Sequence, residues 1–279
     1  MERTLDERRA NFWVGEWEGG WLLLPLIAVL GGDWAFSVEA PVSNGSLPLA
    51  LALALVGWAP LWRALMMTDW ATPLAQWHAW RESTSLPRWP YLQPGTPGAA
   101  LYRAVGQALS WWRDFGRQTL LIPLRSGLFS LGVALLLSVA LGRFALLLTL
   151  LFLTIAEFAV LWHEGRGQVD RGWEALALAG LPWMLGASLQ GRILLPLASA
   201  LVVTVLVGCM SRPGLWLLAG DLLGVLFLLW QGEPFAAGVL VLLTFPALWL
   251  AVNRVEEDHY RRVVVPWLFA VLLLFAGVL

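Results

Sequence analysis

Two long apolar runs that meet at one short polar break constrain this chain more than any other feature. The first run forms the last part of the stretch 117–142, and the second run covers residues 144–162. Arg143 lies between them. An α-helix of about 20 apolar residues is long enough to cross a hydrocarbon core of about 30 Å. Because a backbone inside that core must satisfy its own hydrogen bonds, the two runs predict a helical hairpin that spans a membrane. The hairpin should begin with a polar, Arg-bearing connection that passes through Pro123 before the helix starts.

The composition extends this prediction to the whole chain. Of the 279 residues, 59% are hydrophobic and 13% are charged, and the mean hydropathy is +0.70. These values are typical of a polytopic membrane protein rather than a soluble domain. We therefore predict an all-α fold with one membrane domain over residues 1–279, an N-terminal cytoplasmic segment at 1–16 and a long cytoplasmic loop at 68–118. The predicted spans are residues 17–30, 47–67, 117–142, 144–162, 173–189, 193–210, 214–230, 235–252 and 263–279.

The arginines predict the orientation of these spans. All basic residues of the chain are Arg. If the N-terminus is cytoplasmic, only Arg143 and Arg192 fall outside, and all the others fall in cytoplasmic segments. This asymmetry is the positive-inside bias, so we expect a cytoplasmic N-terminus and an external C-terminus in the cytoplasmic membrane of a prokaryote.

Other counts exclude several classes of function. The single cysteine, Cys209, lies in an apolar run, so a disulfide or a thiolate metal site within one chain is excluded. The net charge of -1 gives no indication of a nucleic-acid partner. The absence of Lys excludes a Schiff base.

The stretch 119–130, TLLIPLRSGLFS, resembles the segment RTxxRPLxSGxxS of UbiA-type membrane prenyltransferases. Ile122 and Gln118 stand where the family has Arg. The resemblance implies a nine-span bundle with the orientation given above. It also implies Mg²⁺-dependent transfer of a prenyl group from a prenyl diphosphate to an aromatic or quinone-like acceptor. The residues at matching positions are Thr119, Pro123, Leu124, Ser126, Gly127 and Ser130.

The sequence departs from the family at its two metal-binding motifs, NxxxDxxxD after span two and DxxxD after span six. Asp69 is the only acid near the end of span two in one register, and Asp114 is the acid retained in the other. Residues 211–213, after span six, contain no acid. Because Mg²⁺ ions on a diphosphate need several converging carboxylates, we expect that metal chemistry has been lost and that no cofactor is bound.

The sequence leaves several functions open. The first is a non-catalytic role, either as a subunit of a larger membrane complex or as a protein that binds an isoprenoid, a quinone or a pigment. The second is a prenyltransferase with degenerate metal ligands, in which Asp69 and Asp114 would take the catalytic positions and Mg²⁺ would be needed. The third is a permease. Residues that would bind a ligand or its diphosphate are Arg63, Arg117, Arg125, Ser126 and Arg212.

The loop 68–118 is rich in Trp and Pro and contains a predicted helix at 99–115. Leu101, Val105, Ala108 and Trp112 share one face of that helix, which is typical of a helix lying in the membrane interface. The loop could cover a cytoplasmic cavity or form a docking surface for a partner.

Two acids, Glu157 and Asp221, fall inside predicted spans. An acid at mid-bilayer costs about 2.5–3.5 kcal/mol on insertion scales, so each should face protein or water. We expect them to be protonated or hydrogen-bonded within the bundle, or to form a proton or ligand site. Gly220 and Gly224 would let a neighbouring helix approach Asp221. The three histidines, His78, His163 and His259, are expected to face solvent.

Overall fold

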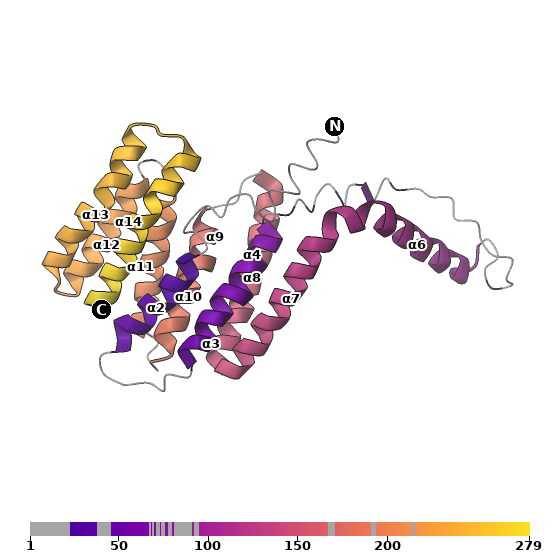
Figure 1. The fold of residues 1–279 in the computed structure, drawn as a ribbon, viewed down its shortest axis with the longest axis horizontal. Coiled ribbons are helices and arrows are strands. Elements are labelled where there is room, and N and C mark those ends of the chain that lie inside the picture. The colour runs from indigo at the N-terminus through magenta and orange to yellow at the C-terminus, as the bar shows by residue number, and fades with distance from the viewer. Residues whose placement is uncertain are drawn as a thin grey trace. The chain divides into compact units, whose positions relative to one another are not determined.

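The computed structural model describes residues 23–37, 46–66, 95–166, 171–190, 194–212 and 216–279, together with positions 68, 70, 73, 76, 77, 80, 91 and 214. All regular structure in this described part is helical, which confirms the all-α prediction (Figure 1). The predicted N-terminal segment 1–16 and the acid Asp69 lie outside it.

The chain divides into two compact units. The first unit is Met1–Trp62 with Ser130–Leu279, and the second is Arg63–Phe129. The second unit holds α6 (Pro97–Trp111), η5 (Trp112–Gly116) and the first half of α7 (Arg117–Leu141). The first unit holds the rest of α7 and most of the other helices: α2 (Leu24–Phe36), α3 (Ser46–Ala52), η3 (Leu53–Trp58), the start of α4 (Ala59–Met66), α8 (Arg143–Arg166), α9 (Arg171–Ala175), η6 (Leu176–Gly180), α10 (Leu181–Ser188), α11 (Leu194–Met210), α12 (Trp216–Trp230), α13 (Pro234–Val252) and α14 (Glu257–Val278).

A helix lies at each predicted span, but not all of these helices are long enough to cross a membrane. Among the described residues, five helical stretches have sufficient length and hydropathy, and three further apolar helices are shorter. The chain is therefore a membrane protein with several membrane-crossing helices, and the count of nine spans stays a prediction. The long stretches are Ser46–Met66, Pro97–Leu141, Arg143–Trp162, Pro234–Val252 and His259–Val278, and the shorter helices are Leu24–Phe36, Leu195–Met210 and Trp216–Trp230.

The first helix ends later than predicted. We expected a span at residues 17–30, whereas α2 continues to Phe36 and is followed by Ser37. Pro25 lies in its first turn, where the missing N–H of proline needs no helical partner. The sequence prediction ended at Leu30 because residues 31–46 were expected to form a polar loop, which would have begun with Gly31 and Gly32. In the structure these two glycines are buried inside the helix instead.

The hairpin turns at Gly142, between α7 and α8. Gly142 has φ +105°, a left-handed conformation that costs glycine nothing. Its N–H donates to Ser138 O at 3.0 Å and so satisfies one of the last carbonyls of α7. Arg143 then begins α8. The break that the sequence placed at Arg143 therefore depends on the glycine before it.

Buried indole rings organise part of the core of the first unit. The Trp58 ring stacks on Phe152 with 5.4 Å between centroids, and its Nε1–H donates to Thr149 Oγ1 at 3.3 Å. Trp183 is also fully buried, and its Nε1–H donates to Ser199 Oγ at 3.0 Å. The indole N–H groups of Trp58 and Trp183 thus both have a hydroxyl partner, as burial in a low-dielectric interior favours.

Local capping explains where α6 begins in the second unit. Thr96 is extended, and its Oγ1 accepts the N–H of Ala99 at 3.2 Å. Pro97 follows as the first helical residue, where its fixed φ suits the start of a helix. From Pro97 the chain is helical as far as Leu141, so the predicted polar connection before the hairpin is in fact helical. Pro123 lies inside α7, a position that membrane helices tolerate.

Candidate functional site: a carboxylate between two arginines and an apolar groove

In the first unit, the start of α9, the end of α11 and the start of α14 lie close together. Gly208 of α11 lies against this start, since a Cβ there would come within 3.5 Å of Ala175 Cβ and 3.8 Å of Gly172 Cα. The buried Tyr260 hydroxyl donates to Met210 O at 3.0 Å and ties the start of α14 to the end of α11. Small residues and one buried hydroxyl therefore hold α9, α11 and α14 close together.

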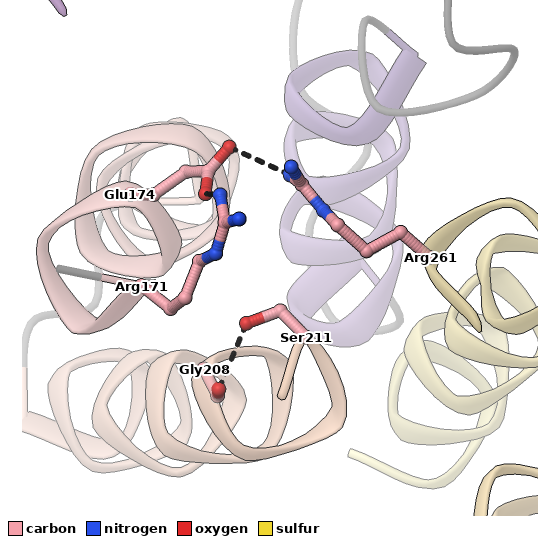
Figure 2. A network of polar contacts seen from close by, with 5 residues as sticks. All are labelled: Arg171, Glu174, Gly208, Ser211 and Arg261. Atoms are coloured by element: carbon pink, nitrogen blue, oxygen red, sulfur yellow. Dashed lines mark hydrogen bonds and ion pairs between the residues drawn. The ribbon is translucent and has the colours of Figure 1, made fainter. Parts of the chain in front are cut away.

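Glu174 accepts hydrogen bonds from two arginines at this junction (Figure 2). Arg171 Nη1 donates to Oε2 at 2.9 Å and Arg261 Nη2 donates to Oε1 at 3.1 Å. The side chains of Glu174 and Arg261 are only 14% and 13% exposed. Both carboxylate oxygens are engaged in charge-assisted hydrogen bonds. The bond from Arg261 joins the start of α14 to α9.

Sequence reasoning missed this cluster. The spacing of Arg171 and Glu174 allows a contact across one helical turn, but it gives no information on burial. Arg261 lies 87 residues further along, in a charged run that looks like a solvated loop. The available signal was Glu174 itself, an acid just inside a predicted span, whose burial requires a nearby cation.

The residues predicted to bind a diphosphate fall in both units. In the second unit Arg63 and Ser126 are half-buried, whereas Arg117 and Arg125 are exposed. In the first unit Arg212 is half-buried just after the end of α11. These five residues therefore remain candidates.

Asp69 and Asp114 were the two acids predicted as possible metal ligands. Asp69 lies outside the described residues. Asp114 is on the surface, and its Oδ1 accepts the Arg113 Nε–H at 2.9 Å. Within the part of the chain that the structure describes, no three His, Cys, Asp or Glu side chains lie together as metal ligands would.

Gly127, in the stretch that resembles the prenyltransferases, has a packing role. A Cβ at Gly127 would lie 3.4 Å from Ala64 Cβ, so α7 and the end of α4 approach closely at this point. Two small residues facing one another are what close helix packing in a membrane requires.

The two acids of the predicted spans differ in their surroundings. Asp221 is half-buried, and Thr244 Oγ1 lies 3.0 Å from its Oδ1, so the expected hydrogen bond within the bundle is present. Side chains of neighbouring helices occupy the space beside Gly220 and Gly224. A Cβ at Gly220 would lie 2.6 Å from Cys209 Cβ, and one at Gly224 would lie 2.7 Å from Leu240 Cδ2. Glu157 is exposed on α8, so the described part of the chain does not bury this acid.

The histidines do not converge on a described site. His259 is exposed at the start of α14, as expected. His78 and the side chain of His163 lie outside the described residues.

An apolar groove of about 510 Å³ lies between α13 and α14. Both helices contain an internal proline, Pro246 and Pro266, and Pro246 lines the groove. The Phe245 and Trp249 side chains are largely exposed along it. Every lining residue is apolar: Phe245, Pro246, Trp249, Leu250, Val263 and Trp267.

No protein-family model, curated protein or solved structure matches this chain. What can be proposed of its function therefore rests on the residues described above.

Proposed function

We propose that this chain is a non-catalytic, UbiA-like membrane protein that holds the apolar chain of an isoprenoid, a quinone or a pigment in the groove between α13 and α14. The observation that carries the proposal is the wholly apolar lining of the groove. Both helices are long and apolar enough to cross a membrane, so the groove faces hydrocarbon rather than water. Its volume lies within the range of about 300–1,000 Å³ that small-molecule sites occupy.

The polar end of such a ligand would lie at the turn between the two helices. Asn253 follows Trp249 by four residues, and His259 precedes Val263 by four, so each polar residue continues the same helical face as a groove residue. Asn253 and His259 are both exposed. An amphiphile with hydrogen-bonding oxygens in its head group, such as a quinone, fits a groove with this polar end.

Contacts at the helix ends support the proposed alternation of spans. With a cytoplasmic N-terminus, the starts of α9 and α14 and the end of α11 are all cytoplasmic. Glu174, Arg261 and Tyr260 join these three ends. At the opposite side, the ends of α2 and α10 would both be external, and Gln190 Nε2 donates to Asp33 Oδ1 there at 2.7 Å. Every one of these bonds joins ends that the nine-span topology puts on the same side.

Native mass spectrometry of the protein in mild detergent, with retained lipids released and identified, tests the proposal. Leu250→Trp would fill the groove. Leu242→Trp makes the same change at a position on the same helix that does not line the groove. We expect the wild type and Leu242→Trp to retain a prenyl or quinone lipid, and Leu250→Trp to lose at least about ten-fold in occupancy, equivalent to about 1.4 kcal/mol.

Two outcomes would overturn the proposed function. Equal lipid retention by both Trp variants would mean that the groove is not the binding site. Recovery of the protein without lipid, inside a stable complex with other membrane proteins, would favour the role of a complex subunit instead.

A further inference from the structure

The helical stretch Pro97–Leu141 is much longer than a membrane crossing requires. Its 45 residues form one unbroken stretch. At 1.5 Å per residue that is about 68 Å, whereas crossing takes about 20 residues. The most apolar part is in α7, so α6 lies outside the hydrocarbon core. Figure 1 shows the chain bending between α6 and α7, where the π-helical turn η5 interrupts the regular ladder of hydrogen bonds.

One face of α6 is covered by the Trp-rich segment before it. Trp80 Nε1 donates to Ser110 Oγ at 3.1 Å, and Gln107 Nε2 donates to Trp80 O at 2.6 Å. The Trp77 ring meets the Trp111 ring edge-on, with 5.6 Å between centroids. These contacts define the inner face of α6.

The opposite face of α6 carries large apolar side chains that no described part of the chain covers. Leu101, Val105 and Leu109 follow one another at four-residue intervals and are 67%, 49% and 64% exposed. Of the predicted face, Leu101 and Val105 belong to this stripe, Ala108 and Trp112 are half-buried, and Leu109 was not predicted. An exposed apolar stripe opposite a satisfied polar face is the pattern of a helix that lies in a membrane surface.

The charge near this stripe matches an anionic lipid surface. Between residues 95 and 129 the chain contains four arginines and one acid, Asp114. Arg113, Arg117 and Arg125 are exposed around the bend. Basic residues at a membrane surface are attracted to anionic head groups. The indole rings of Trp111 and Trp112 pack over Gly116 at the same bend, and Trp is favoured at this depth of the bilayer.

We propose that α6 lies in the plane of the membrane surface, with Leu101, Val105 and Leu109 inserted among the lipid chains and the arginines of the bend against anionic head groups. The inner face of α6, which contacts Trp77 and Trp80, then faces away from the bilayer.

Fluorophores attached to single cysteines test this orientation. Because the chain has one cysteine, Cys209→Ala alone gives a cysteine-free background. Leu101→Cys and Leu109→Cys would place an environment-sensitive dye on the outer stripe. Arg103→Cys is the matched control, since it is an exposed position on the same helix outside the stripe. The labelled full-length protein is reconstituted in phosphatidylcholine vesicles with and without phosphatidylglycerol, and nitroxide-labelled lipids serve as quenchers.

We expect strong quenching at positions 101 and 109 and several-fold weaker quenching at 103. Quenching should also be greater when phosphatidylglycerol is present. Equal quenching at all three positions would overturn the orientation. Dyes at 101 and 109 that are shielded from water but not quenched by lipid would show that a protein surface covers the stripe, and would overturn the choice of lipid. Equal quenching in vesicles with and without phosphatidylglycerol would mean that the arginines do not hold α6 against anionic head groups.

Discussion

Glu174 and Arg261 lie 87 residues apart in the sequence, yet Arg261 Nη2 donates to Glu174 Oε1 at 3.1 Å. The bond joins the start of α9 to the start of α14. Because Arg171 engages the other carboxylate oxygen, Glu174 is the common partner of two cations that are largely removed from water. Removal of this carboxylate would take away the partner that the two cations share.

Glu174→Ala should destabilise the protein by about 3 kcal/mol, because removing one partner of a largely buried ion pair is strongly destabilising. Reversible unfolding in detergent, followed by circular dichroism, measures the change in unfolding free energy. Glu233→Ala is a suitable control, since Glu233 is exposed at the start of α13 and its side chain makes no capping bond. A loss no greater for Glu174→Ala than for Glu233→Ala would mean that the cluster does not stabilise the bundle.

A double-mutant cycle separates the pair from its surroundings. Arg261→Ala alone should also destabilise, and the double variant Glu174→Ala with Arg261→Ala should lose less than the sum of the two single changes. A coupling energy above about 1 kcal/mol is expected for residues in direct contact within one network. Additive losses would mean that the effect of each residue does not come from the bond between them.

The contact between α2 and α10 depends on the absence of two side chains. A Cβ at Gly32 would lie 2.1 Å from Trp183 O, and a Cβ at Gly186 would lie 2.1 Å from Val29 O. Both clashes are with backbone, which does not yield by a change of rotamer. Gly32→Ala and Gly186→Ala should each cost about 1–3 kcal/mol or more, the usual effect of overpacking.

Gly238 and Gly277 provide matched controls for this prediction. Both lie in helices, and no described atom outside their own helix backbone lies within 4 Å of a Cβ built there. Their replacement by Ala should be neutral or stabilise by up to about 1 kcal/mol, because Ala favours the helix. Thermal unfolding of the four variants in one detergent compares them directly. Similar midpoints for all four would contradict the close approach of α2 and α10.

The sequence predicted where helices form better than it predicted which residues contact one another. Length and hydropathy located the hairpin 117–162 and the face of α6, because both depend on residues that are near one another in the chain. The partner of Glu174 depends on a fold that brings distant residues together, and no local pattern contains this information. The burial of Trp58 and Trp183 was also not foreseen, since Trp at a span is most often an interface residue. Candidate ligand residues were chosen by resemblance, and the structure places four of them in one unit and Arg212 in the other.

Arg254 occupies a position that favours glycine. It has φ +52° after the end of α13, its N–H donates to Ala251 O at 3.2 Å, and the Val255 N–H donates to Leu250 O at 3.4 Å. This is the helix-ending motif in which the left-handed residue is usually Gly. Arg254→Gly should stabilise the protein by about 1 kcal/mol, since a side chain in this conformation costs about 1–2 kcal/mol.

The control for Arg254→Gly is the same substitution in a regular helix. Arg262 is exposed on α14, so Arg262→Gly should destabilise by about 1 kcal/mol. Unfolding in denaturant gives both values on one scale. Opposite signs are expected. A loss of stability at both positions would mean that the side chain of Arg254 contributes more than its backbone conformation costs.

Asp221 shows how an acid can be accommodated within an apolar helix. Its carboxylate lies 3.0 Å from Thr244 Oγ1, and that hydroxyl also lies within bonding distance of Leu240 O. Asp221→Asn keeps a hydrogen-bonding group of the same shape, so stability should change by no more than about 0.5 kcal/mol. Leu222 is the adjacent residue, and it is exposed on the same helix.

Leu222→Asp adds a second acid at the next position, where the side chain is exposed and does not replace the one that bonds Thr244. It should cost about 2.5–3.5 kcal/mol, the penalty for an unpartnered acid at the centre of a membrane helix. Equilibrium refolding into lipid bicelles, followed by tryptophan fluorescence, compares this variant with Asp221→Asn. A large loss for Asp221→Asn would mean that the carboxylate itself is required, which would favour a proton or ion site at Asp221. A small loss for Leu222→Asp would instead mean that α12 faces water or a polar partner, so that the bond to Thr244 would not be what makes Asp221 tolerable.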